Sequence, residues 1–322
     1  MIIDRRACMG ALGAFGLSAF LPARAQGKAL RILVGYAPGG AADLVARAVG
    51  EGLRDAGYTV LVENRPGAAG RLATDALLAA PTDGQTLMFA PQGNLTLYPH
   101  LYKSVKFDPL KDVAGVGTAT TMGFALAVGA QSPARTLQAF LELAKKQPTM
   151  ASFGTPGAGT AMHFLGTMLA REAQVPLTHV PYKGGAAAVT DAIGGNLPAV
   201  ITTTPNLLPM HRSGRLRILA VSDANPHPAL PEVPTLRSLG FTDLSLSETF
   251  ALFVRAGTPA PLVSQLNQAL AAALASPKVL TVLEKAEFTP LSTTATELDK
   301  RIQTEHAAWG RIVKAVGYTP EE

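Results

Sequence analysis

The stretch that decides the fold is RILVGYAPGGAADLVARAV, residues 31–49. Its aliphatic start, residues 32–34, indicates a strand, and a helix with apolar positions at helical spacing begins near Asp43. The loop between them, residues 36–42, contains two adjacent glycines and no Lys or Arg. A strand, a tight loop and a helix start leave backbone N–H groups free to bind an anion. We therefore expect an anion held by backbone amides and water, with an empty turn as the alternative.

The first 25 residues have the pattern of a secretory signal peptide. Arg5 and Arg6 precede the uncharged stretch 7–21, and a small-x-small site ends at Ala25. The apolar stretch is shorter than the ~20 residues that a membrane-spanning helix needs. We expect export and cleavage after Ala25, by either the general or the twin-arginine route.

The expected mature chain has no cysteine, because the single one, Cys8, lies in the segment that is removed. An exported chain without disulfides must depend on an ordinary hydrophobic core, and this chain is long enough to build one over two lobes. The whole sequence carries a net charge of +5, without a run of Lys or Arg and with few aromatic residues. Nucleic-acid binding is therefore not expected.

Short apolar runs alternate with helical patterns along the rest of the chain, which is typical of α/β proteins with mostly parallel sheets flanked by helices. The expected strands are 30–35, 59–63, 86–90, 124–129, 150–154, 177–181, 197–202, 216–221 and 250–254. The expected helices are 43–56, 70–80, 136–147, 160–172, 185–194, 260–275, 277–286 and 295–316. In the last helix, Trp309 shares a helical spacing with Ile312, Val313 and Val316, which indicates core packing.

The chain is expected to cross between two lobes around 123–131 and again around 221–231. Residues 26–130 and 223–322 would then form a discontinuous lobe 1, and residues 131–222 would form lobe 2. Such an architecture binds its ligand between the lobes, near the carboxyl ends of strands.

Four loops at predicted strand ends could carry the site: 36–43, 90–94, 154–160 and 202–205. They are rich in Gly, Thr and amide side chains and bring neither a carboxylate pair nor a basic cluster. The run GTPGAG (154–159) matches neither a dinucleotide fingerprint nor a P-loop, and no G-x-S-x-G elbow occurs. The six histidines are not at metal-ligand spacing. We expect no catalytic residue, no metal and no cofactor.

Several segments resemble the periplasmic substrate-binding proteins of tripartite tricarboxylate transporters, the Bug family. The segments are VGYAPGGAADLVAR, VENRPGAAG, PTDGQTLMFA, GTPGAGTAMH, HVPYKGGAAAVTDAIGG, SGRLRILAVSD, LPEVPT and RAGTPAPLVSQLN. The resemblance extends over nearly the whole expected mature chain. It implies a two-lobed type II periplasmic-binding-protein fold that closes on a small carboxylate.

The loops and the resemblance together lead us to expect a ligand site formed by these residues: Tyr36, Ala37, Gly39, Gly40, Ala41, Asp43, Pro91, Gln92, Thr155, Gly157, Gly159, Thr160, His163, Thr202, Thr203, Glu248, Thr249 and Phe250. A side chain at Gly40 would block the approach of the ligand to the backbone and would force an unfavourable φ. For His163, a structural role in fixing the preceding loop is an equally good alternative.

The sequence departs from the usual family pattern at four places. Tyr36 and Ala37 replace Phe-Pro, and Ala41 replaces a hydroxyl residue. Ala158 stands in place of Asn, and Thr202 stands where many relatives carry Asp. We therefore expect a carboxylate ligand without a free ammonium group, because a buried ammonium needs an anionic partner. Glu248 is the one acid that could reach such a group.

The resemblance implies a periplasmic, monomeric receptor that is not an enzyme and that delivers its ligand to the membrane permease subunits of a tripartite tricarboxylate transporter. A protein that presents its ligand to a membrane kinase would have the same fold and stays an alternative. An exported hydrolase using the same cleft is a further alternative.

Overall fold

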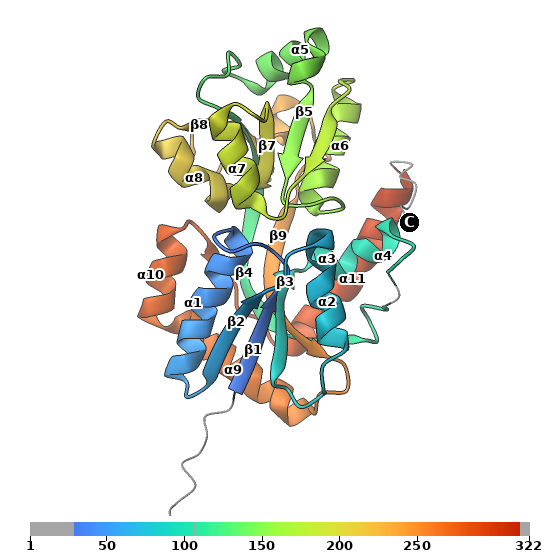
Figure 1. Cartoon of the computed structure of the whole chain (residues 1–322), viewed down its shortest axis with the longest axis vertical. Coiled ribbons are helices and arrows are strands. Elements are labelled where there is room, and N and C mark those ends of the chain that lie inside the picture. Colours follow the sequence, from blue (N-terminus) through green and yellow to red (C-terminus); the bar gives the residue numbers. More distant parts are fainter. Residues whose placement is uncertain (1–28, 106, 316–322) are drawn as a thin grey trace, which may run out of the picture.

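Strand β4 (Val113–Gly129) runs through both halves of the molecule and belongs to two sheets (Figure 1). Up to Gly123 it pairs with β9 (Ser247–Arg255), and from Phe124 it pairs with strands of the other half. This computed structural model describes residues 29–105 and 107–315. The expected signal peptide, residues 1–25, and Val316 lie outside the described residues.

We define lobe 1 as the described residues up to 123 and from 247 onward, and lobe 2 as residues 124–246. The sequence-based boundaries, 130/131 and 222/223, remain a prediction. The strand pairing leads us to propose 123/124 and 246/247 instead, because residues 124–129 of β4 pair within lobe 2. The loop after Val221 also stays with lobe 2, where Leu230 and Val233 join its core.

Lobe 1 is built on a sheet in the order β2–β1–β3–β9–β4, with β10 on β4. Its other strands are β1 (Ala29–Val34), β2 (Thr59–Asn64), β3 (Thr86–Pro91) and β10 (Thr289–Pro290). Its helices are α1 (Ala41–Asp55), α2 (Arg71–Leu78), α3 (Gly93–Thr96), α4 (Tyr98–Leu101), α9 (Ala260–Ala275), α10 (Pro277–Lys285) and α11 (Ala295–Ala315). Strand β1 is parallel to β2 and β3, whereas β9 is antiparallel to β3 and β4.

Lobe 2 continues the sheet in the order β4–β7–β5–β6, with β8 also on β4. Its strands are β5 (Ser152–Thr155), β6 (Thr178–Pro181), β7 (Ala199–Thr203) and β8 (Leu216–Val221). Its helices are α5 (Leu137–Lys146), α6 (Ala161–Glu172), α7 (Gly185–Gly194) and α8 (Thr204–Arg212). Strands β5, β6 and β7 are parallel to one another, and β4 is antiparallel to β7 and β8.

The helix starts of the two lobes face each other because of this arrangement. In Figure 1, α1 lies below the boundary between the lobes, and α7 and α8 lie above it. All three helices begin at the boundary and run away from it. Helix α1 buries Val45, Val49 and Leu53 in the lobe 1 core, which fixes its direction relative to the sheet. In an α/β layer, helices follow strands, so strand carboxyl ends and helix N-termini lie at the same edge.

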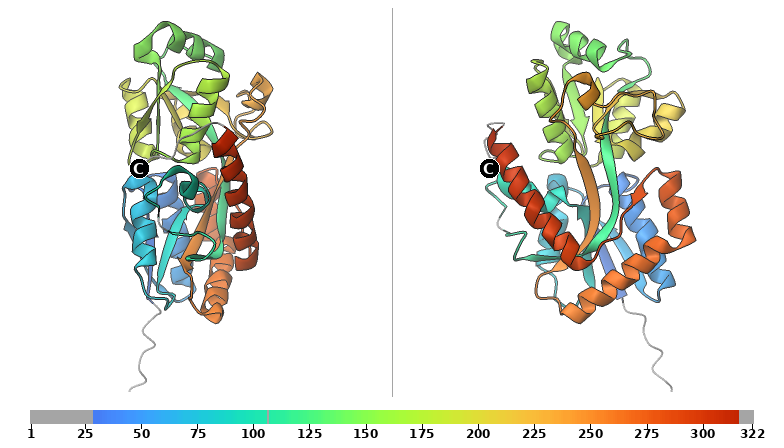
Figure 2. Two further views of the ribbon diagram at one scale, coloured as in Figure 1. Left: turned by 90° about the vertical axis from the view of Figure 1, so that its right-hand side faces the viewer. Right: turned by 180° about the vertical axis from the view of Figure 1, so that it is seen from behind.

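The long helix α11 belongs to lobe 1 but reaches lobe 2 (Figure 2). The ring of Trp309 lies edge-on to that of Phe164 on α6, with centroids 6.0 Å apart. The Trp309 side chain is 9% exposed. The core-packing role predicted for this residue thus takes place across the lobe boundary.

No single helix of the described residues is long and apolar enough to span a membrane. Helices α9 and α10 meet that requirement only as a pair, and they are bent by 66° at their junction.

Trp309 is the single tryptophan of the chain, so its fluorescence should report on the contact between the lobes. We expect weak quenching by acrylamide in the folded protein, since Phe164 and its neighbours cover the indole. The measurement is a Stern–Volmer titration of the folded protein against the urea-unfolded chain. Equal quenching constants for the two states would contradict the packing described.

Candidate functional site

A small pocket lies between the two lobes and has a volume of about 30 Å³. Lobe 1 contributes Tyr36, Gly40, Ala41, Ala42, Pro91 and Phe250, and lobe 2 contributes Pro156, Met162, Gly185, Thr202, Thr203 and Asn206. No charged side chain is among the described residues that line it. The pocket therefore offers backbone groups, hydroxyls, an amide and apolar side chains to a ligand.

The loop before α1 is shaped by Gly39, whose φ is +85°, whereas Gly40 has an extended φ of −86°. The expectation that a side chain at Gly40 would force an unfavourable φ is therefore wrong. Gly40 is the N-cap residue of α1 and provides no side-chain cap. The first N–H groups of α1 are consequently left without a side-chain acceptor at the pocket.

Asp43 supports this loop from behind and does not line the pocket. Its carboxylate accepts from the Gly39 N–H (3.0 Å) and Asn64 Nδ2 (2.8 Å) and pairs with Arg47 (2.9 Å). Burial alone would raise the pKa of Asp43, but these partners outweigh it and hold the pKa below its usual range. The charge of Asp43 is thus satisfied within lobe 1.

In lobe 2 the predicted Gly-rich loop is held by its own side chains. The Thr160 hydroxyl caps α6 by accepting from His163 N–H, and it donates to Gly157 O at 2.9 Å. His163 Nδ1 accepts from Gly159 N–H at 3.0 Å, and its ring stacks on His179 at 3.8 Å between centroids. These bonds give His163 the structural role considered as its alternative.

His179 lies deeper in this group and is kept neutral. Burial and the neighbouring His163 lower the pKa of His179 to about 3. The Thr155 hydroxyl lies 2.7 Å from His179 Nε2 and 3.0 Å from Gly157 O. Pro156 of the loop and Met162 of α6 line the pocket, whereas Thr155 and the two histidines are not among its lining residues.

The second part of the lobe 2 wall is formed by α7 and α8. Gly185 starts α7 where a Cβ would collide with Asn206 and would lie 2.6 Å from Thr202 Oγ1. The Thr203 hydroxyl is buried and has no hydrogen-bond partner among the described residues. Across the lobe boundary, Ala37 N–H donates to Lys183 O at 3.0 Å.

The ends of β3 and β9 bring a buried polar group beneath the pocket. Gln92 is fully buried, and neither atom of its amide has a partner among the described residues. Glu248 accepts from Gly93 N–H (3.3 Å) and Thr249 N–H (3.1 Å). Burial, followed by the Glu305 carboxylate, raises the pKa of Glu248 to about 8 despite these bonds. Glu248 is therefore mainly protonated at neutral pH.

The structure brings only part of the predicted set to the pocket surface. The lining members are Tyr36, Gly40, Ala41, Pro91, Thr202, Thr203 and Phe250. The members that are not among the lining residues are Ala37, Gly39, Asp43, Gln92, Thr155, Gly157, Gly159, Thr160, His163, Glu248 and Thr249. Ligand contact by any of them remains a prediction.

Five lining residues were not predicted: Ala42, Pro156, Met162, Gly185 and Asn206. Pro156 and Gly185 could have been predicted, since each stands next to a glycine at a predicted strand end or helix start. Asn206 was missed because α8 was not expected. Pro205 and Pro209 lie inside α8, and proline usually argues against a helix except in its first turn.

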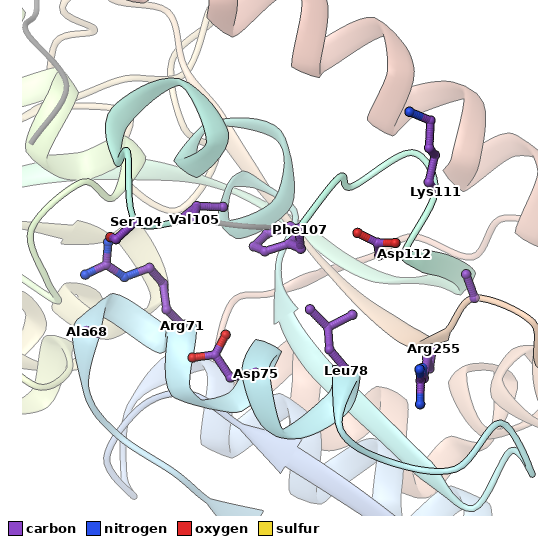
Figure 3. A pocket seen from close by; sticks show the side chains of 11 residues that line it. Ala68, Arg71, Asp75, Leu78, Ser104, Val105, Phe107, Lys111, Asp112 and Arg255 are labelled. Carbon is purple, nitrogen blue, oxygen red and sulfur yellow. The ribbon is translucent and has the colours of Figure 1, made fainter. Parts of the chain in front are cut away.

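A larger cavity, about 630 Å³, lies on lobe 1 between α2 and the loops around 104–112 and 255–256 (Figure 3). Three of the charged residues that line it, Lys111, Asp112 and Arg255, have partners within the lobe. Lys111 pairs with Asp108 at 2.9 Å, and Arg255 donates to Ala80 O at 2.8 Å. Because it lies outside the lobe boundary, closure of the lobes would not enclose a ligand there.

No group of three or more His, Cys, Asp or Glu side chains within residues 29–105 and 107–315 is placed to hold a metal ion. Among the described residues that line the pocket, hydroxyl groups are present but no His, Asp or Glu stands beside them as a base. The chemistry they offer is hydrogen bonding from neutral donors.

Comparison with known proteins supplies the family. The model of the tripartite tricarboxylate transporter family receptors, TctC, matches residues 45–318. The chain belongs to this family. The expected family is thus confirmed.

Solved structures of periplasmic binding proteins are similar over most of the chain. BugD is 28% identical with a TM-score of 0.86, and the match covers 91% of this chain and 98% of BugD. MatC from Rhodopseudomonas palustris with bound malate is 26% identical, with a TM-score of 0.83 and coverage of 88% and 98%. R. palustris Rpa4515 with adipate is 25% identical, with a TM-score of 0.85 and coverage of 91% and 98%. The two-lobed periplasmic-binding-protein fold is confirmed.

One prediction from the geometry of the site concerns Gly40→Val. The extended φ and the free space around Gly40, whose Cβ would meet only Ala37 O at 3.8 Å, should let the chain fold normally. The new side chain would occupy the pocket, so we expect ligand binding to be lost while the melting temperature changes little. Calorimetric titration and thermal unfolding check the two parts. Binding equal to that of the wild type would show that this loop is not part of the site.

Another prediction concerns the pH dependence of stability. The pKa of Glu248 is about 8 in the folded protein, above the ordinary value of 4.5, so folding favours the protonated form. Its stabilising effect is complete below pH 4.5 and is lost as the pH rises toward 8. In Glu248→Gln we expect this loss to disappear. The free energy of unfolding should then fall less steeply with pH, by up to about 1.4 kcal/mol per pH unit.

Urea unfolding at several pH values between 5 and 8 measures this slope. Glu142→Gln on the exposed face of α5 is the matched control and should keep the wild-type slope. A Glu248→Gln protein with an unchanged slope would show that Glu248 is already ionised.

Proposed function

We propose that this chain is a periplasmic receptor that binds a small organic carboxylate between its lobes and delivers it to the permease subunits of a tripartite tricarboxylate transporter. One observation carries the proposal: helices from both lobes begin at one uncharged pocket without side-chain caps. These helices are α1 from lobe 1 and α7 and α8 from lobe 2.

Helices α2, α3, α4 and α9 also begin without a side-chain cap, but the starts of α1, α7 and α8 lie at the pocket between the lobes. In lobe 2, α5 and α6 begin at Thr136 and Thr160, whose hydroxyls accept from N–H groups of the first turn. At the pocket, Gly40 and Gly184 have no side chain to do so, and the Thr203 hydroxyl makes no such bond. The N–H groups that a cap would satisfy are left for a ligand or for water.

A carboxylate fits these ends because helix N-termini carry partial positive charge as well as free donors. Two lobes supplying such ends can hold the same anionic group from opposite sides. Met162, Phe250 and the two prolines provide apolar contact for the rest of a small ligand. A ligand with these two parts would stabilise the closed form through contacts to both lobes.

A ligand with a free ammonium group fits poorly. No described residue that lines the pocket is acidic, and Glu248 behind it is largely neutral at pH 7 because burial raises its pKa to about 8. An ammonium enclosed there would lack an anionic partner, which is costly in a desolvated site. Malate in MatC and adipate in Rpa4515 are carboxylates without an amine.

The hydroxyl-bearing residues among the described lining residues are Tyr36, Thr202 and Thr203, and no His, Asp or Glu lines the pocket beside them to act as a base. Catalysis would need a nucleophile or an acid–base group at the reacting atom. This composition favours capture and release over turnover.

A thermal-shift panel tests the proposal. It includes malate, adipate, succinate and benzoate, their amide analogues, and the amino acids aspartate and glutamate. We expect one or more amine-free carboxylates to raise the melting temperature. A ligand at a concentration 100 times its dissociation constant adds about 2.7 kcal/mol to the free energy of unfolding. Stabilisation by amino acids alone would contradict the ligand class, and Glu248→Gln would then test that residue as the ammonium partner.

A further inference from the structure

A turn after β2 carries unusual backbone strain. The four residues Gly67, Ala68, Ala69 and Gly70 all have positive φ, with values of 142°, 46°, 54° and 95°. Glycine adopts such angles freely, but the Cβ of an alanine is strained there. Strain of this kind persists only where surrounding contacts impose it, and it is frequent at functional sites.

Two tyrosines hold this turn and connect it to the pocket. Tyr98 donates its hydroxyl to Ala69 O at 2.6 Å. The Tyr36 hydroxyl lies 3.1 Å from the same oxygen and 3.0 Å from Asn94 Oδ1. Tyr36 lines the pocket between the lobes, so one side chain contacts both the ligand space and the strained turn.

The strained turn contacts the other lobe at a position where a side chain would not fit. A Cβ on Gly157 of lobe 2 would lie 2.9 Å from Ala69 Cβ and 3.1 Å from Ala69 Cα. Next to it, Tyr102 of lobe 1 fills the space beside Gly159, and the Arg71 guanidinium lies 3.7 Å above the Tyr102 ring. Arg71 also lines the larger lobe 1 cavity shown in Figure 3.

We propose that the contact of Ala69 with Gly157 sets how far the lobes close, so that Ala69 is a positioning residue for ligand binding although it does not line the pocket. The inference rests on the proposed function, since it needs a ligand that is enclosed by closure. The contact is complete only in the closed form. A poorer fit between Ala69 and Gly157 therefore shifts the equilibrium toward the open form. The apparent affinity for the ligand falls in proportion to the fraction of molecules that can close.

The test is a pair of complementary substitutions. Gly157→Ala adds a methyl group that meets Ala69. Gly157 is not among the glycines with positive φ, so alanine is compatible with its backbone. Ala69→Gly removes the opposing methyl group and is favourable at a φ of 54°. The double variant has one methyl group at the contact, as the wild type does.

We expect Gly157→Ala to weaken binding of malate or adipate roughly 10-fold or more, as overpacking of a close contact does. The double variant should recover to within roughly 3-fold of the wild type, which a merely damaged loop would not do. Gly194→Ala, at the far end of α7, is the control. Its Cβ would have 3.5 Å to the nearest atom, and binding should be unchanged.

Small-angle scattering of the ligand-free proteins separates this inference from the proposed function. We expect a larger radius of gyration for Gly157→Ala and a return toward the wild-type value in the double variant. If neither malate nor adipate binds the wild type, neither of the two is its ligand, and scattering alone decides the contact. Unchanged affinity and unchanged scattering in Gly157→Ala, or failure of Ala69→Gly to rescue it, would overturn the inference.

Discussion

The structure depends on one continuous strand, β4, that belongs to both lobes. Residues 113–123 pair with β9 in lobe 1, and residues 124–129 pair with β7 and β8 in lobe 2. Because a shared strand fixes the direction of both sheets, the helix starts of one lobe face those of the other. The pocket, its uncapped helices and the contact of Ala69 with Gly157 all follow from that geometry.

In the proposed site, backbone donors are left without side-chain caps and no charged side chain lines the pocket. Gly40 and Gly184 start helices without providing a cap, while charged groups near the pocket are neutralised in other ways. Asp43 is paired with Arg47, and burial keeps Glu248 largely protonated at neutral pH by raising its pKa to about 8. Under the proposed function, such a neutral site would bind an anion through backbone donors and would disfavour a positive group on the same ligand.

Much of the architecture could be predicted from the sequence because strands and helices alternate with clear periodicity. Helices α7 and α9 were predicted with the observed bounds. The first part of β4 was not, since VAGVGTATTMG is rich in Gly and Thr and lacks a continuous apolar run. Helix α8 was missed because of its prolines. No local pattern indicates that β4 would serve two sheets, since that is decided by pairing with distant strands.

The candidate site, like the fold, could be predicted from the sequence only in part. The loop before α1 could be located because glycine marks close backbone approach, as at Gly40, whereas the lining residue Gly185 was not predicted. Which loop residue faces the ligand space depends on tertiary contacts, so the lining residue Pro156 was missed while Thr155, which holds the loop from behind, was included. The strained Ala68 and Ala69 could not be recognised either, because alanine by itself gives no sign of a left-handed backbone.

The most direct test of the central claim is a crystal structure of this chain with a bound carboxylate. We predict that the carboxylate lies between the lobes and accepts from backbone N–H groups at the starts of α1 and of α7 or α8, directly or through water. No Lys or Arg side chain should lie within hydrogen-bond distance of it. This account would be contradicted if the carboxylate were held by Arg71 or Lys111 in the larger lobe 1 cavity and the space between the lobes were empty.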